Sequence, residues 1–169
     1  MITEICATAT TYIIEKTDKR NRGLKFDECV FMTSKRLQKL LFFCDVQYML
    51  EHNGMPMFPD EYYAWPSGPV IPSIYQSHTE YEYGYSNLIG REGWRSQLTP
   101  DMQHTIDEVF DATIKMDTAE LIKLSHDEKG PWWNAYSEND LEHKQLIPKD
   151  LIYAYYKEYP KHHNGRLFS

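Results

Sequence analysis

The segment SKRLQKLLFFCDVQYML, residues 34–50, decides the fold. Apolar residues recur along it at the three- and four-residue spacing of a helix: Leu37, Leu40, Leu41, Cys44 and Tyr48. Thr33 or Ser34 can cap this helix, and Gly54 stands where a left-handed residue often ends one. Further apolar residues occupy its other faces, so we expect the helix to be covered on nearly all sides and to lie at the centre of the protein.

Helical periodicity continues on both sides of the central segment. It predicts helices over residues 3–16, 99–115, 117–124 and 148–159, and a short one from Pro72 to about His78. Asp117 and Glu120 have the spacing of a capping box. Residues 18–27 are predicted to form a charged loop, and Gly130-Pro131 is predicted to end a helix.

One small β element is expected beside these helices. Residues 62–65 are an aromatic run of strand character, and the three prolines in residues 66–72 predict a rigid turn. A second short strand is expected near 88–90, within a loop over residues 79–98. The predicted fold class is therefore mainly α: a compact helical domain over residues 1–160 with a short strand or hairpin around 60–65 and 88–90, and a tail over 161–169.

The length and charge of the chain limit the function further. Its 169 residues fit one domain, and its formal net charge of -7 would not attract phosphate backbones to the whole surface. Residues 16–39, however, hold eight Lys or Arg against three Asp or Glu. This asymmetry has two interpretations, a surface for a charged partner or solvated helix faces and loops, and the second is the commoner case.

The cysteines and the N-terminal residues predict a cytoplasmic protein. Cys6, Cys29 and Cys44 match neither a redox pair nor a zinc-ligand spacing, so reduced thiols are expected. The first residues lack the pattern of a secretory signal, and no stretch approaches 18 consecutive apolar residues. We expect no membrane association.

Motifs that carry catalysis are absent from the sequence. There is no HExxH, GxSxG, GxxxxGK[ST] or GxGxxG pattern, so we expect no metal, no cofactor and no enzymatic activity. His126 and Asp127, near Trp132, can be interpreted as a general-acid pair. The favoured interpretation is that His126 complements the negative end of a helix dipole.

Two sets of residues are candidates for binding a partner. Lys35, Arg36 and Lys39 begin the central helix and can contact phosphates or an acidic partner with its first turn. The second set is a tyrosine-rich loop comprising Tyr81, Tyr83 and Tyr85. Tyrosine combines contact area with a polar tip, although such a loop can equally lie on the body of the protein.

An ordered series of motifs resembles the Panacea antitoxin domain family, also described as SocA-like or GepA-type and phage-associated. The motifs are KRLQKLLFF at 35–43, GMPMF at 54–58, EYYAW at 61–65, GPV at 68–70, PSIY at 72–75, ELIKLSH at 120–126, PW at 131–132 and AY at 135–136. Eleven of these positions are expected to serve the architecture first: Leu37, Leu40, Leu41, Trp65, Gly68, Pro69, Val70, Pro72, His126, Pro131 and Trp132. Trp132 or its neighbour Trp133 becomes a candidate anchor if it is exposed.

The resemblance implies a non-catalytic, mainly helical domain that neutralises a toxin encoded beside it by direct protein-protein binding. It also implies a possible role as an adaptor that delivers the toxin to a bacterial protease. A DNA-binding regulator of a phage or mobile element, acting through Lys35, Arg36 and Lys39, stays open as an alternative from the residues themselves.

Overall fold

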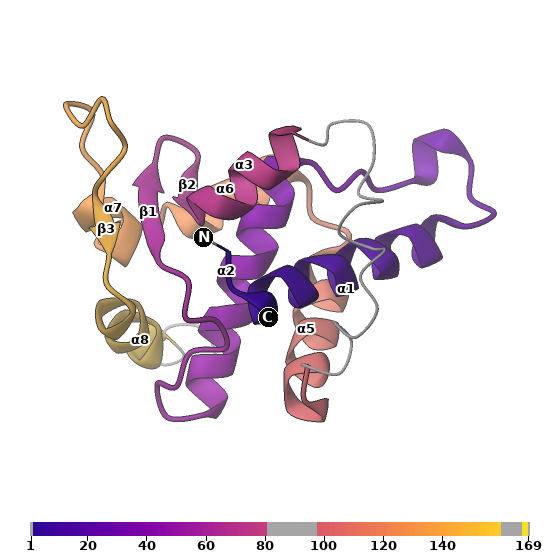
Figure 1. The fold of residues 1–169 in the computed structure, drawn as a ribbon, viewed down its shortest axis with the longest axis horizontal. Helices are drawn as coiled ribbons and strands as arrows, with labels where there is room; N and C mark the ends of the chain where they lie inside the picture. Colours follow the sequence, from indigo (N-terminus) through magenta and orange to yellow (C-terminus); the bar gives the residue numbers. More distant parts are fainter. Residues whose placement is uncertain (1, 81–97, 160–166, 169) are drawn as a thin grey trace.

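The fold is organised around one buried helix. The computed structural model describes residues 2–80, 98–159 and 167–168 (Figure 1). In it, α2 (Ser34–Glu51) runs through the middle of the molecule, and 13 of its 18 residues are buried. Thr33 caps it by accepting a hydrogen bond from the backbone N–H of Arg36, as predicted. The central position of this helix is therefore confirmed.

The other helices in the described part of the chain are α1 (Glu4–Asn21), η1 (Phe26–Glu28), α3 (Pro72–Glu80), α5 (Pro100–Thr113), α6 (Thr118–Ser125), α7 (Pro131–Ala135) and α8 (Lys149–Glu158). Helices α1, α3, α5, α6 and α8 all contact α2 directly. Thr99 caps α5 and Asp117 caps α6 in a capping box, so both predicted starts are confirmed. No helix in the described part of the chain is long and apolar enough to cross a membrane.

Helix α1 is longer than predicted. The charged loop was expected to begin at residue 18, but residues 18–21 belong to the helix. The helix continues to Asn21 because its threonines are accommodated inside it. The hydroxyl groups of Thr10, Thr11 and Thr17 each donate to the carbonyl four residues earlier, so buried β-branched residues keep their polar atoms satisfied. Gly23, with φ +77°, then turns the chain away.

The β element is a three-stranded antiparallel sheet of order β2-β1-β3, formed by β1 (Tyr62–Trp65), β2 (Gly68–Val70) and β3 (Leu146–Ile147). The predicted strand β1 is confirmed. The predicted turn over 66–72 is only partly right, because Gly68–Val70 pairs with β1 across a two-residue connection. Pro69 is tolerated since β2 is an edge strand, where a missing N–H removes no ladder bond. The strand expected near 88–90 lies outside the described residues.

Two elements near the C-terminus differ from the prediction. Pro131 begins the short helix α7 instead of ending a helix, because a proline needs no N–H in a first turn. Strand β3 was not predicted, since two residues give no alternation to detect. Leu167 is buried and the ring of Phe168 lies edge-on to Phe43, so the end of the predicted tail contacts the core. The division into residues 1–160 and a tail stays a prediction.

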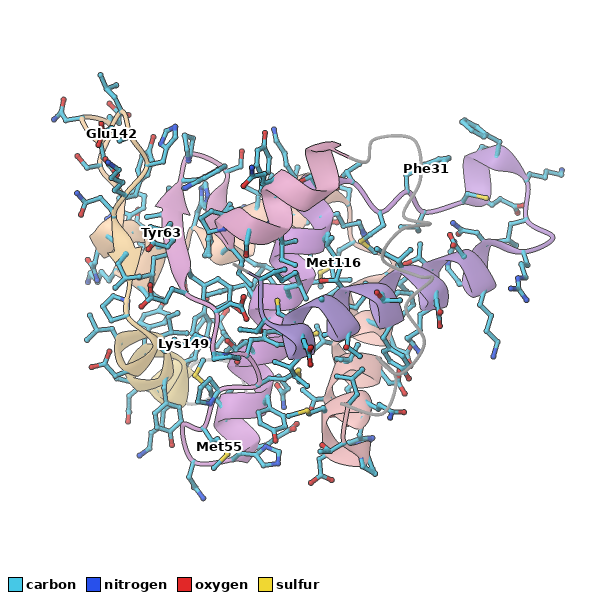
Figure 2. All side chains as sticks on the ribbon, viewed as in Figure 1. Phe31, Met55, Tyr63, Met116, Glu142 and Lys149 are labelled. Carbon is cyan, nitrogen blue, oxygen red and sulfur yellow. The ribbon has the colours of Figure 1, made fainter. Side chains whose placement is uncertain are left out.

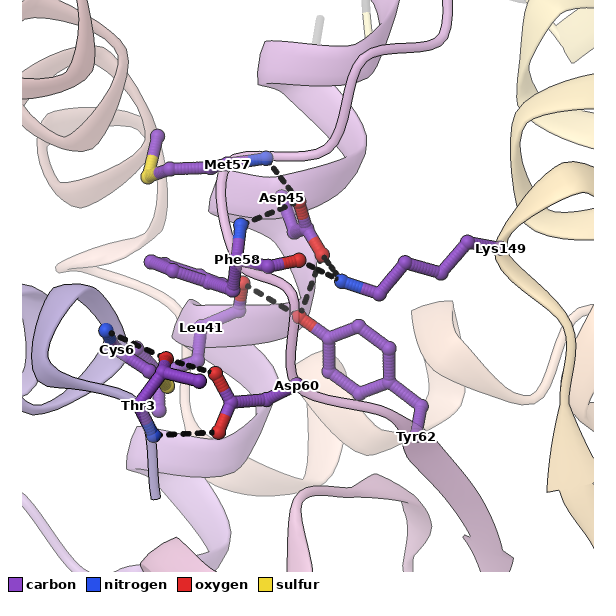
Figure 3. Close-up of polar contacts among 9 residues, drawn as sticks. All are labelled: Thr3, Cys6, Leu41, Asp45, Met57, Phe58, Asp60, Tyr62 and Lys149. Carbon is purple, nitrogen blue, oxygen red and sulfur yellow. Dashed lines mark hydrogen bonds and ion pairs between the residues drawn. The ribbon is translucent and has the colours of Figure 1, made fainter. Parts of the chain in front are cut away.

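A buried ion pair joins α2 to α8 and to the chain before β1 (Figure 3). Asp45 is fully buried, and its carboxylate accepts from Lys149 Nζ at 2.8 Å, from the Met57 N–H at 2.7 Å and from the Tyr62 hydroxyl at 3.1 Å. Lys149 also donates to the carbonyl of Phe58. Three segments distant in sequence therefore meet at one carboxylate: α2, residues 57–62 and the start of α8.

Removing this carboxylate should destabilise the protein strongly. We expect Asp45→Ala to lower the free energy of unfolding by about 3 kcal/mol, because it removes the counter-charge of the Lys149 ammonium and the carboxylate that accepts from the Met57 N–H and the Tyr62 hydroxyl. Urea denaturation measures the loss. The matched control is Lys144→Ala, which breaks an ion pair with Glu142 whose side chains are 72% exposed, and should change stability by less than about 1 kcal/mol. Equal losses for the two variants would contradict this account.

Candidate partner-binding surface

The second residue of the KRLQKLLFF motif, Arg36, closes the end of a neighbouring helix. Its guanidinium donates to the carbonyls of Met116 at 2.7 Å, Thr113 at 2.9 Å and Ile114 at 3.3 Å. These carbonyls lie at and just after the C-terminus of α5, where helices leave acceptors unsatisfied. Arg36 is 3% exposed, so the prediction that it contacts a partner or DNA is wrong.

The next two polar residues hold the β-hairpin against α2. The Gln38 amide donates to the Ile71 carbonyl at 3.1 Å and accepts from the Ile71 N–H at 2.8 Å. The Lys39 ammonium donates to the Pro69 carbonyl at 2.9 Å and is fully buried. The prediction that Lys39 contacts a partner is therefore wrong, because the hairpin covers it. Of the three predicted cations, Lys35 is exposed.

The environment of Lys39 disfavours its charge. Burial, with a smaller contribution from the nearby charge of Lys35, lowers the pKa of Lys39 to about 7. The charged form of this side chain is therefore less favoured at neutral pH than that of an exposed lysine. Its role is to satisfy one backbone carbonyl in the interior, where an unpaired acceptor would be costly.

Gly68 allows this close approach of the hairpin to the helices. Its φ of +107° is unfavourable for other residues, and a Cβ added there would lie 2.5 Å from Ser125 Oγ and 2.7 Å from Lys39 Cε. The glycine at the start of the GPV motif is thus required by both backbone conformation and contact.

His126 and Trp132 complete the same region on its other side. Their rings stack with centroids 3.5 Å apart, and the Trp132 indole N–H donates to the Trp65 carbonyl at 2.8 Å. Burial, followed by the charge of Lys39, lowers the pKa of His126 to about 4. The neutral form of the ring is therefore favoured at pH 7. His126 stands at the C-cap of α6, at the end of the helix as predicted, but a neutral ring compensates the helix dipole only weakly. Asp127 does not form the general-acid pair, since its carboxylate accepts from the Tyr155 hydroxyl at 2.6 Å.

The remaining motif positions lie in or against the core. Six of them are buried: Leu37, Leu40, Leu41, Pro69, Val70 and Pro131. Trp65 is partly buried with its ring against Tyr75, and Pro72 begins α3. In the part of the chain that the structure describes, no group of three or more His, Cys, Asp or Glu side chains is placed to hold a metal ion.

The exposed apolar residues are the remaining candidates for binding. Trp133 is 52% exposed, in contrast to its buried neighbour Trp132, and is a candidate anchor. Tyr81, Tyr83 and Tyr85 lie outside the described residues, so their role in binding stays a prediction. Three more exposed residues, Leu24, Phe26 and Phe31, lie on what we call the arm, residues 19–31, which comprises the last turn of α1 and the connection to α2.

The arm has a defined structure that the sequence did not predict. The Asn21 amide donates to the Val30 carbonyl at 2.7 Å and accepts from the Val30 N–H at 3.0 Å. Arg20 donates to the Glu28 carbonyl at 2.9 Å. The side chain of Glu28 accepts from the N–H of Lys25 at 3.0 Å, which closes the turn of η1.

Comparison with known proteins identifies the family. A family model described as "Antitoxin SocA-like, Panacea domain" matches residues 37–133, more than half of the chain. The chain belongs to the SocA-like Panacea domain family. The matched residues begin in α2 and end in α7, so they include Lys39, Gly68, His126 and Trp132. The arm precedes the matched region.

A curated relative of this Panacea domain is the "Antitoxin SocA" of Caulobacter vibrioides (strain NA1000 / CB15N). It is 29% identical over 105 residues, which cover 57% of this chain. The chain spans about half of that relative, since the aligned residues are 55% of its length. No solved structure matches the chain.

The contact at Gly68 is testable by substitution with a matched glycine. We expect Gly68→Ala to lower the free energy of unfolding by about 3 kcal/mol, because it adds both an unfavourable φ and a clash with Ser125 and Lys39. Gly23→Ala is the control. Gly23 also has a positive φ, +77°, but no atom lies within 4 Å of its added Cβ, so a loss of about 1 kcal/mol is expected. Urea denaturation of both variants measures the difference, and a similar loss at both positions would refute the close packing.

The lowered pKa of Lys39 predicts a pH dependence of stability. The unfolded chain holds this proton up to its ordinary pKa of 10.5, whereas the folded protein releases it near 7. Between these values the unfolded state binds more protons, so the contribution of Lys39 makes the protein more stable as pH rises, by at most about 1.4 kcal/mol per pH unit. Below pH 7 the contribution is constant, because both states are protonated.

Lys39→Met removes this contribution while retaining most of the side-chain volume. The stability of the wild type relative to this variant should therefore rise between pH 7.5 and 9.5 in urea denaturation. The control is Lys123→Met, which changes an exposed lysine of α6. The difference in its free energy of unfolding from the wild type should not change with pH. A pH-independent difference for Lys39→Met would show that its proton is not released on folding.

Proposed function

We propose that this protein is an antitoxin that neutralises a toxin encoded by an adjacent gene, and that it does so by direct protein-protein binding without catalysis. The observation that carries this proposal is the match of the Panacea domain model to residues 37–133, the part of the chain that forms most of the described fold. The sequence similarity to the antitoxin SocA of Caulobacter vibrioides agrees with it.

The use of the polar residues in the matched region supports binding over catalysis. Gln38, Lys39 and Trp132 each make hydrogen bonds to backbone groups of a neighbouring segment, and His126 is stacked and neutral at pH 7. A general acid or base needs a titratable group that can reach a substrate. These side chains are instead occupied in holding the hairpin to α2.

The DNA-binding alternative loses most of its proposed contacts. Lys35, Arg36 and Lys39 were to contact phosphates together, and two of them are buried against backbone carbonyls. A single exposed lysine supplies little of the electrostatic free energy that phosphate binding requires. These three residues therefore give little support to DNA binding.

Co-expression with the adjacent gene product tests the antitoxin proposal. We expect the neighbour alone to arrest growth, and co-expression of this protein to restore growth and to yield a complex on co-purification. Asp45→Ala, which destabilises the fold, should restore growth less well. The half-life of the neighbour measured in the same cells separates blocking, which leaves it unchanged, from delivery to a protease, which shortens it. A harmless neighbour, or the absence of a complex, would refute the proposal.

A further inference from the structure

We infer that the arm, residues 19–31, is the surface with which this protein docks onto its toxin, and that the toxin presents an apolar pocket rimmed by carboxylates. The inference rests on the proposed antitoxin function and adds the contact surface and the chemistry of the partner. It depends on three properties of the arm: exposed aromatic groups, a preformed structure and a local excess of positive charge.

The arm exposes apolar groups that a folded chain ordinarily buries. Phe26 is 81% exposed and Phe31 is 55% exposed, and their rings touch with centroids 5.1 Å apart. Leu24 adds a third side chain, which is 39% exposed. Burial of a phenylalanine contributes roughly 1.5–3 kcal/mol, so these residues leave a large hydrophobic contribution available to a partner.

The location of the arm leaves it open to a partner. Figure 1 shows the segment from the end of α1 through η1 projecting from one end of the molecule's long axis, and Figure 2 places Phe31 there, at the opposite end from Glu142. A projecting segment can enter a concave site. The arm therefore suits insertion into a pocket better than contact with a flat face.

The arm is also held in shape before any partner binds. The paired hydrogen bonds of Asn21 with Val30 close its base, and Arg20 ties the base to the carbonyl of Glu28. A segment that is already ordered loses less conformational entropy when it docks, so more of its burial appears as affinity.

The charge of the arm indicates the chemistry of its partner. The arm holds four cations, Lys19, Arg20, Arg22 and Lys25, against two carboxylates, in a chain whose formal net charge is -7. All four cations are exposed. A net positive charge beside exposed apolar groups complements a partner whose apolar pocket carries carboxylates, and the attraction accelerates encounter with it.

A protein is favoured over a nucleic acid as the occupant. The two phenylalanine rings contact each other at a 51° tilt, which leaves no parallel slot between them for a base.

The test compares two pairs of exposed apolar residues at opposite ends of the molecule. The arm variant is Phe26→Ser with Phe31→Ser, and the control variant is Leu141→Ser with Leu151→Ser, whose leucines are 85% and 56% exposed. The probe is the purified product of the adjacent gene. We expect the arm variant to raise Kd by about 30-fold or more and the control variant to change it by less than about threefold.

Charge reversal tests the electrostatic part of the inference separately. Its readout is the salt dependence of the association rate, which the loss of apolar side chains leaves unchanged. Arg22→Glu with Lys25→Glu should slow association with the same probe and weaken the dependence of the association rate on salt concentration. The exposed positions of all these residues predict small effects on folding, which circular dichroism and urea denaturation verify.

The possible outcomes separate the two proposals. If the wild type forms no complex with the probe, the antitoxin function fails and the inference fails with it. If the wild type binds and neutralises the probe while the arm variant binds as tightly, only the inference is overturned. It is also overturned if the arm variant abolishes self-association of the wild type in size-exclusion chromatography, or abolishes binding of a fluorescent 20-nucleotide single-stranded RNA.

Discussion

The structure depends on the use of buried polar side chains in α2 to satisfy the backbone of the segments around it. Arg36 donates to carbonyls at the end of α5, and Gln38 and Lys39 bind backbone groups in and just after the hairpin. Asp45 accepts from the backbone before β1. A helix covered only by apolar contacts would leave its neighbours free to slide, because the hydrophobic effect is non-directional. Hydrogen bonds to particular backbone groups define one position for each neighbour, and an unpaired group would carry a desolvation cost.

This arrangement separates the residues that build the domain from those available for recognition. The region matched by the family model contains Gln38, Lys39, Gly68 and Trp132, which join the hairpin to the helices. The arm precedes that region, and the side chains of Arg20, Asn21 and Glu28 make their hydrogen bonds within the arm. The arm can therefore change in sequence without disturbing the contacts of α2, as a surface adapted to one partner requires.

Helices and their starts were predictable from the sequence because local rules determine them. Thr33, Thr99 and Asp117 cap the helices that periodicity predicted, and residues 62–65 form the predicted strand. Burial of the cations was not predictable, since the exposure of Lys39 depends on where a hairpin thirty residues later comes to lie. The role of Asp45 was missed for the same reason, because its partner Lys149 is 104 residues away.

The cationic segment of the sequence shows why local charge alone could not locate a binding surface. Residues 16–39 hold eight cations that appear as one basic region, yet the fold divides them. Arg36 and Lys39 point inward, where desolvation lowers the pKa of each and their hydrogen bonds replace lost hydration. The cations of the arm stay in water, at one end of a chain that is otherwise strongly acidic. Because its charge is separated in this way, the protein is oriented by the electric field of an acidic partner before the two touch. The arm therefore makes the first contact.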